Sequence, residues 1–423
     1  MRVDVPWGTG TVPVEIPEER VAGVLQPRQP ESVAPLSDLM REGLKAFRSF
    51  LAAAKSPLVV LVNDGTRPTP SAAVLALLRD DLERWHSSLA HDRELFFLIA
   101  TGTHRAPTPE EVETIFGADL AAVYRARIIA HDAWDTARLV SLGHTRAGTP
   151  VIVNKTLADA ESVLIINSVE PHYFAGYTGG RKSVVPGVAA FETVRFNHQF
   201  AMRPGSVDLV LDGNPVHEDL TEATAMALAG KQVFSIQLVL DSNHRICYVA
   251  CGDWDQTLRD AARVADEQYV LDIDAPVDIV VSVASHPMDC DLYQTNKAIQ
   301  SGAYAVRPGG ILIVVSRCPF GIGHNRTFFD VLSAGSSPDE VIARAGEEYQ
   351  LGLHQATRIA SILKRAEIWA VTNLPDQDLR SIFFLPFPDV QSAVDAALRK
   401  KGPDAKVLFL LAASITVPRV RTA

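Results

Sequence analysis

Short aliphatic runs recur along the chain, and several are followed by a polar loop and a segment with helical spacing. Residues 56–82 predict a strand, a loop and a helix. Residues 94–116 repeat this order, and Thr108 and Glu111 are spaced to form a capping box at the start of the helix. Residues 159–180 add a further strand and a glycine-rich loop. This alternation is typical of an α/β fold with partly parallel sheets.

A second α/β pattern begins near Asp274, because residues 275–316 predict a strand, a polar loop, a helix and another strand. We therefore predict an N-terminal domain over residues 1–272 and a C-terminal domain over residues 273–423, with an active-site cleft between them. The helical pattern of residues 253–270 would connect the two domains, and the first twenty residues predict a strand pair with a glycine turn.

Polar and charged residues follow the predicted strands of the first domain. The three segments are Asp64–Arg67, Gly102–His104 and Glu170–His172. In open α/β sheets, ligands bind at the carboxyl ends of the strands. The sequence therefore predicts that these three loops line one binding site.

Composition narrows the classes of function. The net charge of −10 and the isoelectric point near 5.7 argue against nucleic-acid binding, which requires concentrated basic residues. The amino terminus lacks the pattern of a signal peptide, and the longest apolar runs are too short to cross a bilayer. The four cysteines have no CxxC spacing and are expected to be reduced. We therefore expect a cytoplasmic protein of 423 residues that binds neither membranes nor nucleic acids.

Histidines supply the first candidate chemistry. His104 and His172 lie in the predicted strand-end loops, and His198 ends a helical pattern. Three histidines can hold zinc and leave one position open, which would suit a hydrolase. The chain has no HxH or HExxH spacing among these residues, so zinc is one of several alternatives.

The segment "GYTGGRKSVVPG" suggests a binding site for an anion. Gly179 and Gly180 allow a close approach of the backbone, and Arg181 and Lys182 add positive charge. The segment matches neither GxGxxG nor the P-loop pattern. A phosphorylated cofactor is therefore expected here, rather than the nucleotide of an ATP-driven motor.

Other polar residues offer substrate contacts. Arg67 lies in a loop bracketed by prolines and could clamp a carboxylate with its planar guanidinium, or simply pair with Asp64. Tyr293, Gln294 and Lys297 are spaced to share a loop and a first helical turn. The pair His131 and Asp132 lacks partner ligands in sequence and is interpreted as structural.

The motifs together resemble the nickel-dependent lactate racemases, a family of 2-hydroxy-acid racemases and epimerases. The resemblance rests on "NDGTRPTP", "TGTHR", "EPHYFAGYTGGRKSVVPGVA" with the His198 that follows, and "DLYQTNKAIQSG". It covers both predicted domains, and the long central motif is the most specific.

The resemblance implies a nickel-pincer nucleotide, a pyridinium-3-thioamide-5-thiocarboxylic acid mononucleotide that holds nickel through carbon and sulfur. Separate maturation enzymes would make it. His198 would be the nickel ligand of the protein, and Lys182 would meet the thiocarbonyl arm of the nucleotide, covalently in some members. The further cofactor contacts that it implies come from Asp64, Thr66, Gly179, Gly180 and Arg181.

The resemblance also assigns acid/base roles to His104 and His172, and substrate binding to four further residues. These are Arg67 for the carboxylate, with Tyr293, Gln294 and Lys297. The chemistry of the substrate is consistent with two bases. The C2 hydrogen of a 2-hydroxy acid leaves more easily as hydride than as a proton. A planar 2-oxo acid then accepts hydride on either face, and each configuration places its hydroxyl near a different base.

One departure leaves the substrate open. Some relatives have a tryptophan where this chain reads "GLHQATRIASIL", which contains His354. Lactate and a longer or more polar acid, such as malate, are both compatible with the sequence. Two other classes of function also stay open at this point: a histidine-liganded zinc hydrolase, and a non-catalytic carrier of the nickel-pincer nucleotide.

Overall fold

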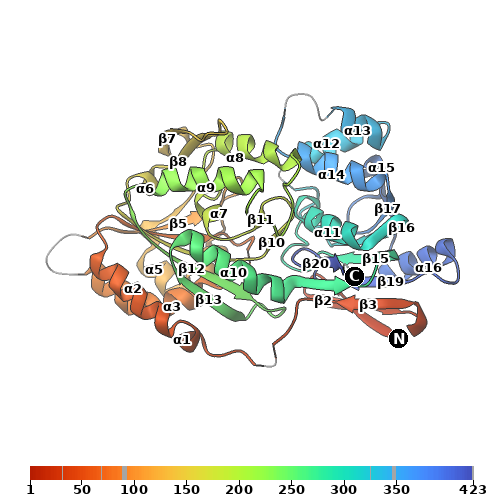
Figure 1. Cartoon of the computed structure of the whole chain (residues 1–423), viewed down its shortest axis with the longest axis horizontal. Coiled ribbons are helices and arrows are strands. Elements are labelled where there is room, and N and C mark those ends of the chain that lie inside the picture. Colours follow the sequence, from red (N-terminus) through yellow and green to blue (C-terminus); the bar gives the residue numbers. More distant parts are fainter. Residues whose placement is uncertain (31, 68, 88–92, 324, 345–348, 422–423) are drawn as a thin grey trace. The chain divides into compact units, whose positions relative to one another are not determined.

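The computed structural model describes residues 1–30, 32–67, 69–87, 93–323, 325–344 and 349–421 (Figure 1). The chain forms two compact units. The central unit is Gln29–Glu267, and the terminal unit combines Met1–Arg28 with Gln268–Ala423. The sequence predicts that residues 1–28 belong to the N-terminal domain, whereas in the structure they belong to the terminal unit. The reason is that strand β3 (Val21–Leu25) pairs in parallel with β19 (Val407–Leu410).

The central unit is built on a six-stranded sheet with the order β13-β12-β9-β4-β5-β6. All neighbours pair in parallel except β12 and the edge strand β13, which are antiparallel. This arrangement confirms the α/β fold with partly parallel sheets. The strands are β4 (Leu58–Asn63), β5 (Leu95–Ala100), β6 (Ile128–Ala130), β9 (Ser162–Ser168), β12 (Gln232–Leu240) and β13 (Ile246–Gly252).

The sheet of the central unit is buried on both faces, which explains its continuous aliphatic runs. Leu58, Val60 and Val62 of β4 pack in a core with the helices on one face, and Val59 and Leu61, which point the other way, are equally buried. The helices of this unit are α1 (Leu36–Leu39), α2 (Arg41–Ala53), α3 (Ser71–His86), α4 (Pro109–Phe116), α5 (Ala118–Val123), α6 (Lys155–Ala158), α7 (Arg181–Val184), α8 (Phe191–His198), α9 (Pro215–Leu228) and α10 (Trp254–Tyr269).

The helix-capping signal predicted from the sequence is present in the structure. The Thr108 side chain accepts from the Glu111 amide and the Glu111 carboxylate accepts from the Thr108 amide, so the capping box of α4 is confirmed. Two small hairpins complete the central unit. They pair β7 (Leu139–His144) with β8 (Pro150–Asn154), and β10 (Pro171–His172) with β11 (Gly176–Tyr177).

The terminal unit has its own six-stranded sheet, with the order β18-β17-β16-β15-β19-β3 and parallel pairing throughout. The predicted strand pair at the amino terminus is confirmed as the antiparallel hairpin of β1 and β2, which packs against this sheet. The remaining strands are β1 (Arg2–Trp7), β2 (Gly10–Glu15), β14 (Val270–Ile273), β15 (Val277–Val283), β16 (Val306–Val315), β17 (Ala366–Val371), β18 (Leu385–Pro386) and β20 (Val417–Val420).

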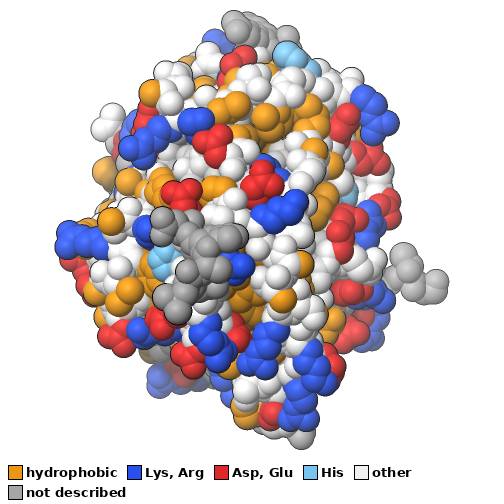
Figure 2. Space-filling view, turned by 90° about the vertical axis from the view of Figure 1, so that its left-hand side faces the viewer, with side chains coloured by type: hydrophobic (Ala, Val, Ile, Leu, Met, Phe, Trp, Pro, Cys, Tyr) orange, Lys and Arg blue, Asp and Glu red, His pale blue; other side chains and the backbone are white. Residues whose placement is uncertain are grey.

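Helices cover the sheet of the terminal unit and bury its two apolar clusters. The helices are α11 (Leu292–Ala305), α12 (Thr327–Ala334), α13 (Pro338–Arg344), α14 (Leu353–Leu363), α15 (Asp376–Ser381) and α16 (Val390–Lys401). In the described part of the chain, no helix combines the length and the hydrophobicity needed to cross a bilayer. On the face drawn in Figure 2, acidic and basic side chains are interspersed.

Candidate active site

Three loops of the central unit leave the same edge of its sheet. Strand β4 pairs in parallel with β5 on one side and with β9 on the other, so the carboxyl ends of all three strands meet. Asp64 directly follows β4, His104 lies in the loop after β5, and His172 ends the two-residue strand β10 that follows β9. The parallel pairing therefore brings the three predicted segments to one edge, as the sequence indicates.

His104 is oriented by a buried carboxylate. Its Nδ1 lies 2.8 Å from Oδ2 of Asp64, and the Thr66 hydroxyl donates to the other carboxylate oxygen at 2.7 Å. A carboxylate can only accept, so Nδ1 of His104 carries a proton in this contact. The neutral ring then has its lone pair on Nε2, which is the arrangement of a base whose tautomer is fixed by a second group.

The ionised form of Asp64 is favoured despite burial. Burial raises the pKa of Asp64, but the charge and hydrogen bond of His104, together with Arg67 and the Thr66 hydroxyl, lower that pKa to below its ordinary value. The carboxylate is therefore charged at neutral pH and stabilises the proton on Nδ1 of His104.

Arg67 keeps most of its hydrogen-bonding capacity. In the described residues its guanidinium forms no ion pair with Asp64, and its one side-chain hydrogen bond runs from Nη1 to the Thr66 carbonyl at 3.5 Å. The side chain is half-buried beside the loop that carries Asp64. This geometry favours the carboxylate clamp over the surface ion pair, because the planar fork retains donors for a ligand.

The glycine-rich loop is buried along residues 171–180. Gly179 and Gly180 have positive φ angles of 78° and 51°. A Cβ atom on Gly179 would lie 2.5 Å from Cγ2 of Val169, so a side chain at this position would collide with the end of β9. The Gly180 amide donates to Oε1 of Gln237 at 2.9 Å. These glycines let the backbone press against the sheet.

Arg181 also points inward. Its side chain is fully buried, and Nη2 donates to the carbonyls of Ala175 at 2.7 Å and Tyr177 at 3.2 Å. The cofactor-binding roles that the sequence predicts for Gly180 and Arg181 stay predictions. In the structure the Gly180 amide and Nη2 of Arg181 already have protein partners, which the sequence does not reveal because they depend on the folded loop and on β12.

Phe174 is the centre of a cluster that the sequence does not reveal. Its ring meets His172 at 4.6 Å and His198 at 5.1 Å between centroids, both edge to face. Nζ of Lys182 lies 5.6 Å from the same ring centroid. One phenyl ring thus contacts three residues that the motifs assign to chemistry, and its place inside "HYFAGY" was the only available signal.

His198 is a neutral imidazole. Burial, and then the positive charge of Lys182, lower the pKa of His198 to about 3. A metal binds the neutral form of the ring, so this environment leaves His198 ready to be a ligand at neutral pH. Lys182, whose Nζ lies 5.6 Å from the centroid of the Phe174 ring, carries a positive charge that suits the anionic groups of a cofactor. His198 and Lys182 together fit a nucleotide that carries nickel.

A three-histidine zinc site lacks its geometry here. Within the residues that the structure describes, no three side chains of His, Cys, Asp or Glu are grouped so that they could hold a metal. His104 is engaged by Asp64, and His198 lies against Phe174. A metal at His198 would therefore draw its other ligands from a bound molecule.

His131 and Asp132 have structural partners, in agreement with their interpretation from the sequence. The buried His131 ring donates from Nε2 to the Ala189 carbonyl at 2.9 Å and accepts at Nδ1 from the Asn154 side chain. Oδ1 of Asp132 accepts from the Trp134 amide at 2.9 Å. These contacts fix the chain after β6.

In the terminal unit, the predicted substrate residues lie at the start of α11. Asp291 caps this helix and accepts from the Gln294 amide at 2.7 Å. Gln294 and Lys297 are three residues apart and so share a helical face. Nζ of Lys297 lies 3.3 Å from Sδ of Met288, and the half-buried Tyr293 packs edge to face on Phe328.

Comparison with known proteins decides the family. Residues 7–208 match the family model described as the lactate racemase N-terminal domain, and residues 273–417 match the lactate racemase C-terminal domain. The chain belongs to the lactate racemase family. It is therefore an isomerase, and its fold is that of the family.

Named relatives agree along nearly the whole chain. The lactate racemase of Thermoanaerobacterium thermosaccharolyticum is 28% identical over 421 residues, which cover 96% of each chain. The lactate racemase of Lactiplantibacillus plantarum is 29% identical, covering 96% of this chain and 97% of that protein.

Solved structures give the same result for the fold. The apoprotein of the Thermoanaerobacterium thermosaccharolyticum lactate racemase superposes with a TM-score of 0.87 at 25% identity, over 99% of this chain and 100% of that one. A Thermotoga maritima protein shares the fold with a TM-score of 0.71 at 18% identity, over 93% of this chain and 100% of that one.

A polar pair lies at the start of helix α14. His354 is the second residue of α14, is buried, and has Nδ1 2.7 Å from the Tyr349 hydroxyl. The two rings also stack, with 24° between their planes. The hydroxyl and the imidazole can both donate and accept hydrogen bonds.

The low pKa of Asp64 predicts a specific pH dependence of stability. Because the folded pKa lies below the unfolded value of about 3.9, the ionised carboxylate stabilises the fold above about pH 4, and this contribution is lost as pH falls through the folded pKa. Asp64→Asn should therefore lose less unfolding free energy than the unchanged protein between about pH 6 and pH 3. Denaturant unfolding across this range measures the difference.

Asp119→Asn is the matched control, because its side chain is 90% exposed. It should follow the unchanged protein. Parallel stability curves for Asp64→Asn and the unchanged protein would contradict the assigned state of Asp64.

Proposed function

We propose that the chain racemises or epimerises a small 2-hydroxy acid with the help of a nickel-pincer nucleotide. The observation that carries this proposal is the cluster around Phe174, in which a neutral His198, Lys182 and His172 come together. His104 supplies a second imidazole from a neighbouring loop at the same sheet edge. Such a set suits a metal-bearing cofactor flanked by two bases.

Residues of the central unit would hold the cofactor. His198 would supply the protein ligand to nickel, and Lys182 would contact or bond the thiocarbonyl arm. Thr66 and Asp64 would support the end that carries the phosphate. When bound, the nucleotide supplies an electrophilic centre that accepts the C2 hydrogen of the substrate as hydride and returns it. Separate maturation enzymes would make the nucleotide, so they are partners that the active protein requires.

The chain's own residues take a proton from the substrate oxygen, return a proton to it, and hold the substrate. With Nδ1 protonated by its contact with Asp64, His104 would accept the hydroxyl proton of one enantiomer at Nε2. As the hydride departs, the alcohol becomes a planar 2-oxo acid. His172 would return a proton to the oxygen when hydride comes back to the opposite face. The reverse direction exchanges the two roles.

Arg67 would bind the carboxylate through two parallel hydrogen bonds, because its guanidinium keeps donors available. This anchor would hold C1 and C2 while the hydroxyl changes sides. Tyr293, Gln294 and Lys297 stay proposed contributors to substrate binding. Gln294 is buried and Lys297 is half-buried on the same face of the capped helix α11, so an amide and an amine lie one helical turn apart, which suits a polar acid.

The substrate class follows the named relatives, which are lactate racemases. We propose lactate or a close homologue, with a longer or more polar acid such as malate included in the class. The pair of Tyr349 and His354 is compatible with this wider range, since a hydroxyl and an imidazole can donate and accept hydrogen bonds.

The ligand and base assignments can be separated by metal content. His198→Ala should lose nickel, because it removes the ring proposed as the protein ligand. His104→Ala and His172→Ala should retain nickel and lose racemisation by roughly a hundredfold or more, the usual size of an acid/base contribution. Metal analysis and a chiral assay on protein coexpressed with a cofactor-making system measure both effects.

His131→Asn is a control histidine variant, since the His131 ring contacts Ala189 and Asn154 instead of the Phe174 cluster. It should keep nickel. Full nickel occupancy in His198→Ala would overturn the ligand assignment. Normal turnover in both base variants together with nickel would point to a cofactor carrier.

A conservative change at Arg67 tests the carboxylate anchor. Arg67→Lys should raise KM for the 2-hydroxy acid about tenfold, because a lysine keeps the charge but loses the planar fork. Steady-state kinetics over a panel of 2-hydroxy acids provides the comparison. An unchanged KM for every acid that is turned over would remove Arg67 from the substrate site.

A further inference from the structure

Arg181 is a buried cation at the start of a short helix. It is the first residue of α7 and has no exposed surface. Nη2 donates to two carbonyls of the preceding loop, those of Ala175 and Tyr177. Nε and Nη1 are buried and have no hydrogen-bond partner among the described residues. The guanidinium is therefore enclosed by the loop that it closes.

Burying a charge is costly unless nearby charges compensate it. Burial lowers the pKa of Arg181 to about 9, while Asp255 acts in the opposite direction, so the side chain stays charged at neutral pH. Among the described residues no carboxylate lies within ion-pair distance of Arg181. Asp255, on the first turn of α10, is the acidic group whose charge acts on it.

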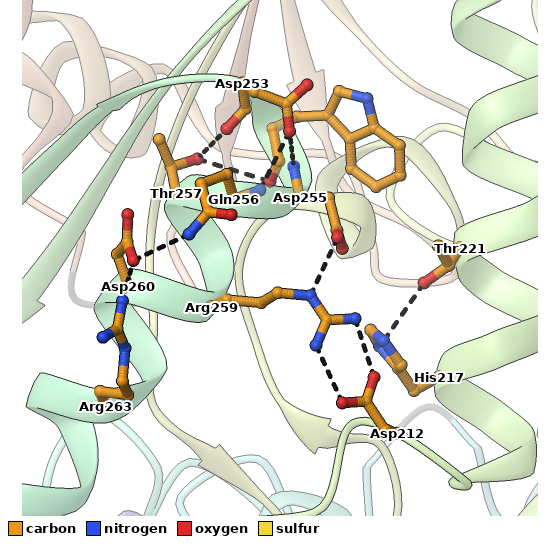
Figure 3. Close-up of polar contacts among 11 residues, drawn as sticks. Asp212, His217, Thr221, Asp253, Asp255, Gln256, Thr257, Arg259, Asp260 and Arg263 are labelled. Atoms are coloured by element: carbon orange, nitrogen blue, oxygen red, sulfur yellow. Dashed lines mark hydrogen bonds and ion pairs between the residues drawn. The ribbon is translucent and has the colours of Figure 1, made fainter.

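Asp255 belongs to a series of alternating charges that reaches the surface (Figure 3). Arg259 donates from Nε to Asp255 at 3.0 Å and pairs through two nitrogens with Asp212, whose side chain is 82% exposed. His217 lies beside this series, and burial, with Arg181 and Arg259, lowers the pKa of His217 to about 3. A neutral His217 adds no second positive charge beside Arg181, and Asp255 is the acidic group whose charge favours the ionised guanidinium.

Helix α10 also contacts the loop directly. The Tyr177 hydroxyl donates to Asp266 at 2.5 Å. A Cβ on Gly180 would lie 3.2 Å from the Trp254 carbonyl, so the loop touches the start of this helix. Helix α9 adds a contact, because the Thr224 hydroxyl donates to the Arg181 carbonyl at 3.3 Å. The loop is thus held at its middle and at its end.

We propose that Arg181 is a positioning residue, which fixes the loop from His172 to Lys182 by binding its carbonyls and uses Asp255 of α10 as countercharge. The adjacent Lys182, half-exposed one residue later, is thereby held against Phe174. The role of Lys182 in cofactor binding rests on the proposed function, whereas the anchoring of the loop by Arg181 is a property of the cofactor-free chain.

The first test is hydrogen exchange on the full-length protein without cofactor. Arg181→Met keeps the length of the side chain but removes its donors and charge. Amides of residues 172–182 should exchange roughly tenfold faster or more, since two buried carbonyls lose their partner. Arg181→Lys restores a charged donor and should recover part of this protection. Arg263→Met, on the exposed side of α10, should leave the loop unchanged.

Asp255 supplies the coupling test. Asp255→Asn alone should accelerate exchange of the same loop, but should add little in the Arg181→Met background because the charge that it balances is already gone. Equal acceleration in both backgrounds would overturn the pairing. Unchanged loop exchange in a folded Arg181→Met protein would overturn the anchoring. If the methionine variant does not fold, an Arg181→Lys protein that also fails to regain a folded, protected loop would overturn it.

Kinetics of the loaded enzyme separates positioning from general destabilisation. Arg181→Lys should lower kcat about tenfold while KM stays within about twofold, because the carboxylate anchor Arg67 is untouched. A rise in KM with constant kcat would contradict a positioning role. If no protein racemises any acid, the proposed function fails, but the exchange results still decide the role of Arg181.

Discussion

The parallel pairing of β5, β4 and β9 is the constraint on which the site depends. It brings three chain segments that are far apart in sequence to one edge of a fully buried sheet. Because both faces of this sheet are covered, a ligand can reach polar side chains at the loops beyond the strand ends. Asp64 and His104 meet there through a hydrogen bond across two strands, and the His172 loop leaves the third.

Burial then sets the chemical state of the groups at this edge. The same loss of water that makes His198 neutral is opposed at Asp64 by a histidine and an arginine, so the carboxylate stays ionised. The loop from His172 to Lys182 is organised by internal partners: Gln237 at Gly180, the guanidinium of Arg181 at two carbonyls, and α10 along its side. A site assembled without its cofactor needs little rearrangement to receive one.

Features coded by neighbouring residues could be predicted from the sequence, and those made by distant contacts could not. The capping box of Thr108 and the strand-end positions of Asp64 and His104 depend on local spacing. The addition of β3 to β19 joins residues almost four hundred positions apart and changes the domain division. The sequence predicts Arg181 as an anion ligand in its glycine loop, but it does not reveal that the carbonyls of Ala175 and Tyr177 accept hydrogen bonds from the buried guanidinium. The roles of the site residues stay predictions, supported by motif and geometry.

The central claim is that His198 and Lys182 hold a nickel-bearing nucleotide that serves a 2-hydroxy-acid racemase. The most direct measurement is the intact mass and metal content of protein coexpressed with a cofactor-making system, followed by a chiral assay on a panel of 2-hydroxy acids. We expect nickel together with added mass at Lys182 or a releasable nucleotide, and exchange of enantiomers for at least one acid. Zinc as the sole metal, with no added mass, no nucleotide and no exchange, would contradict the account.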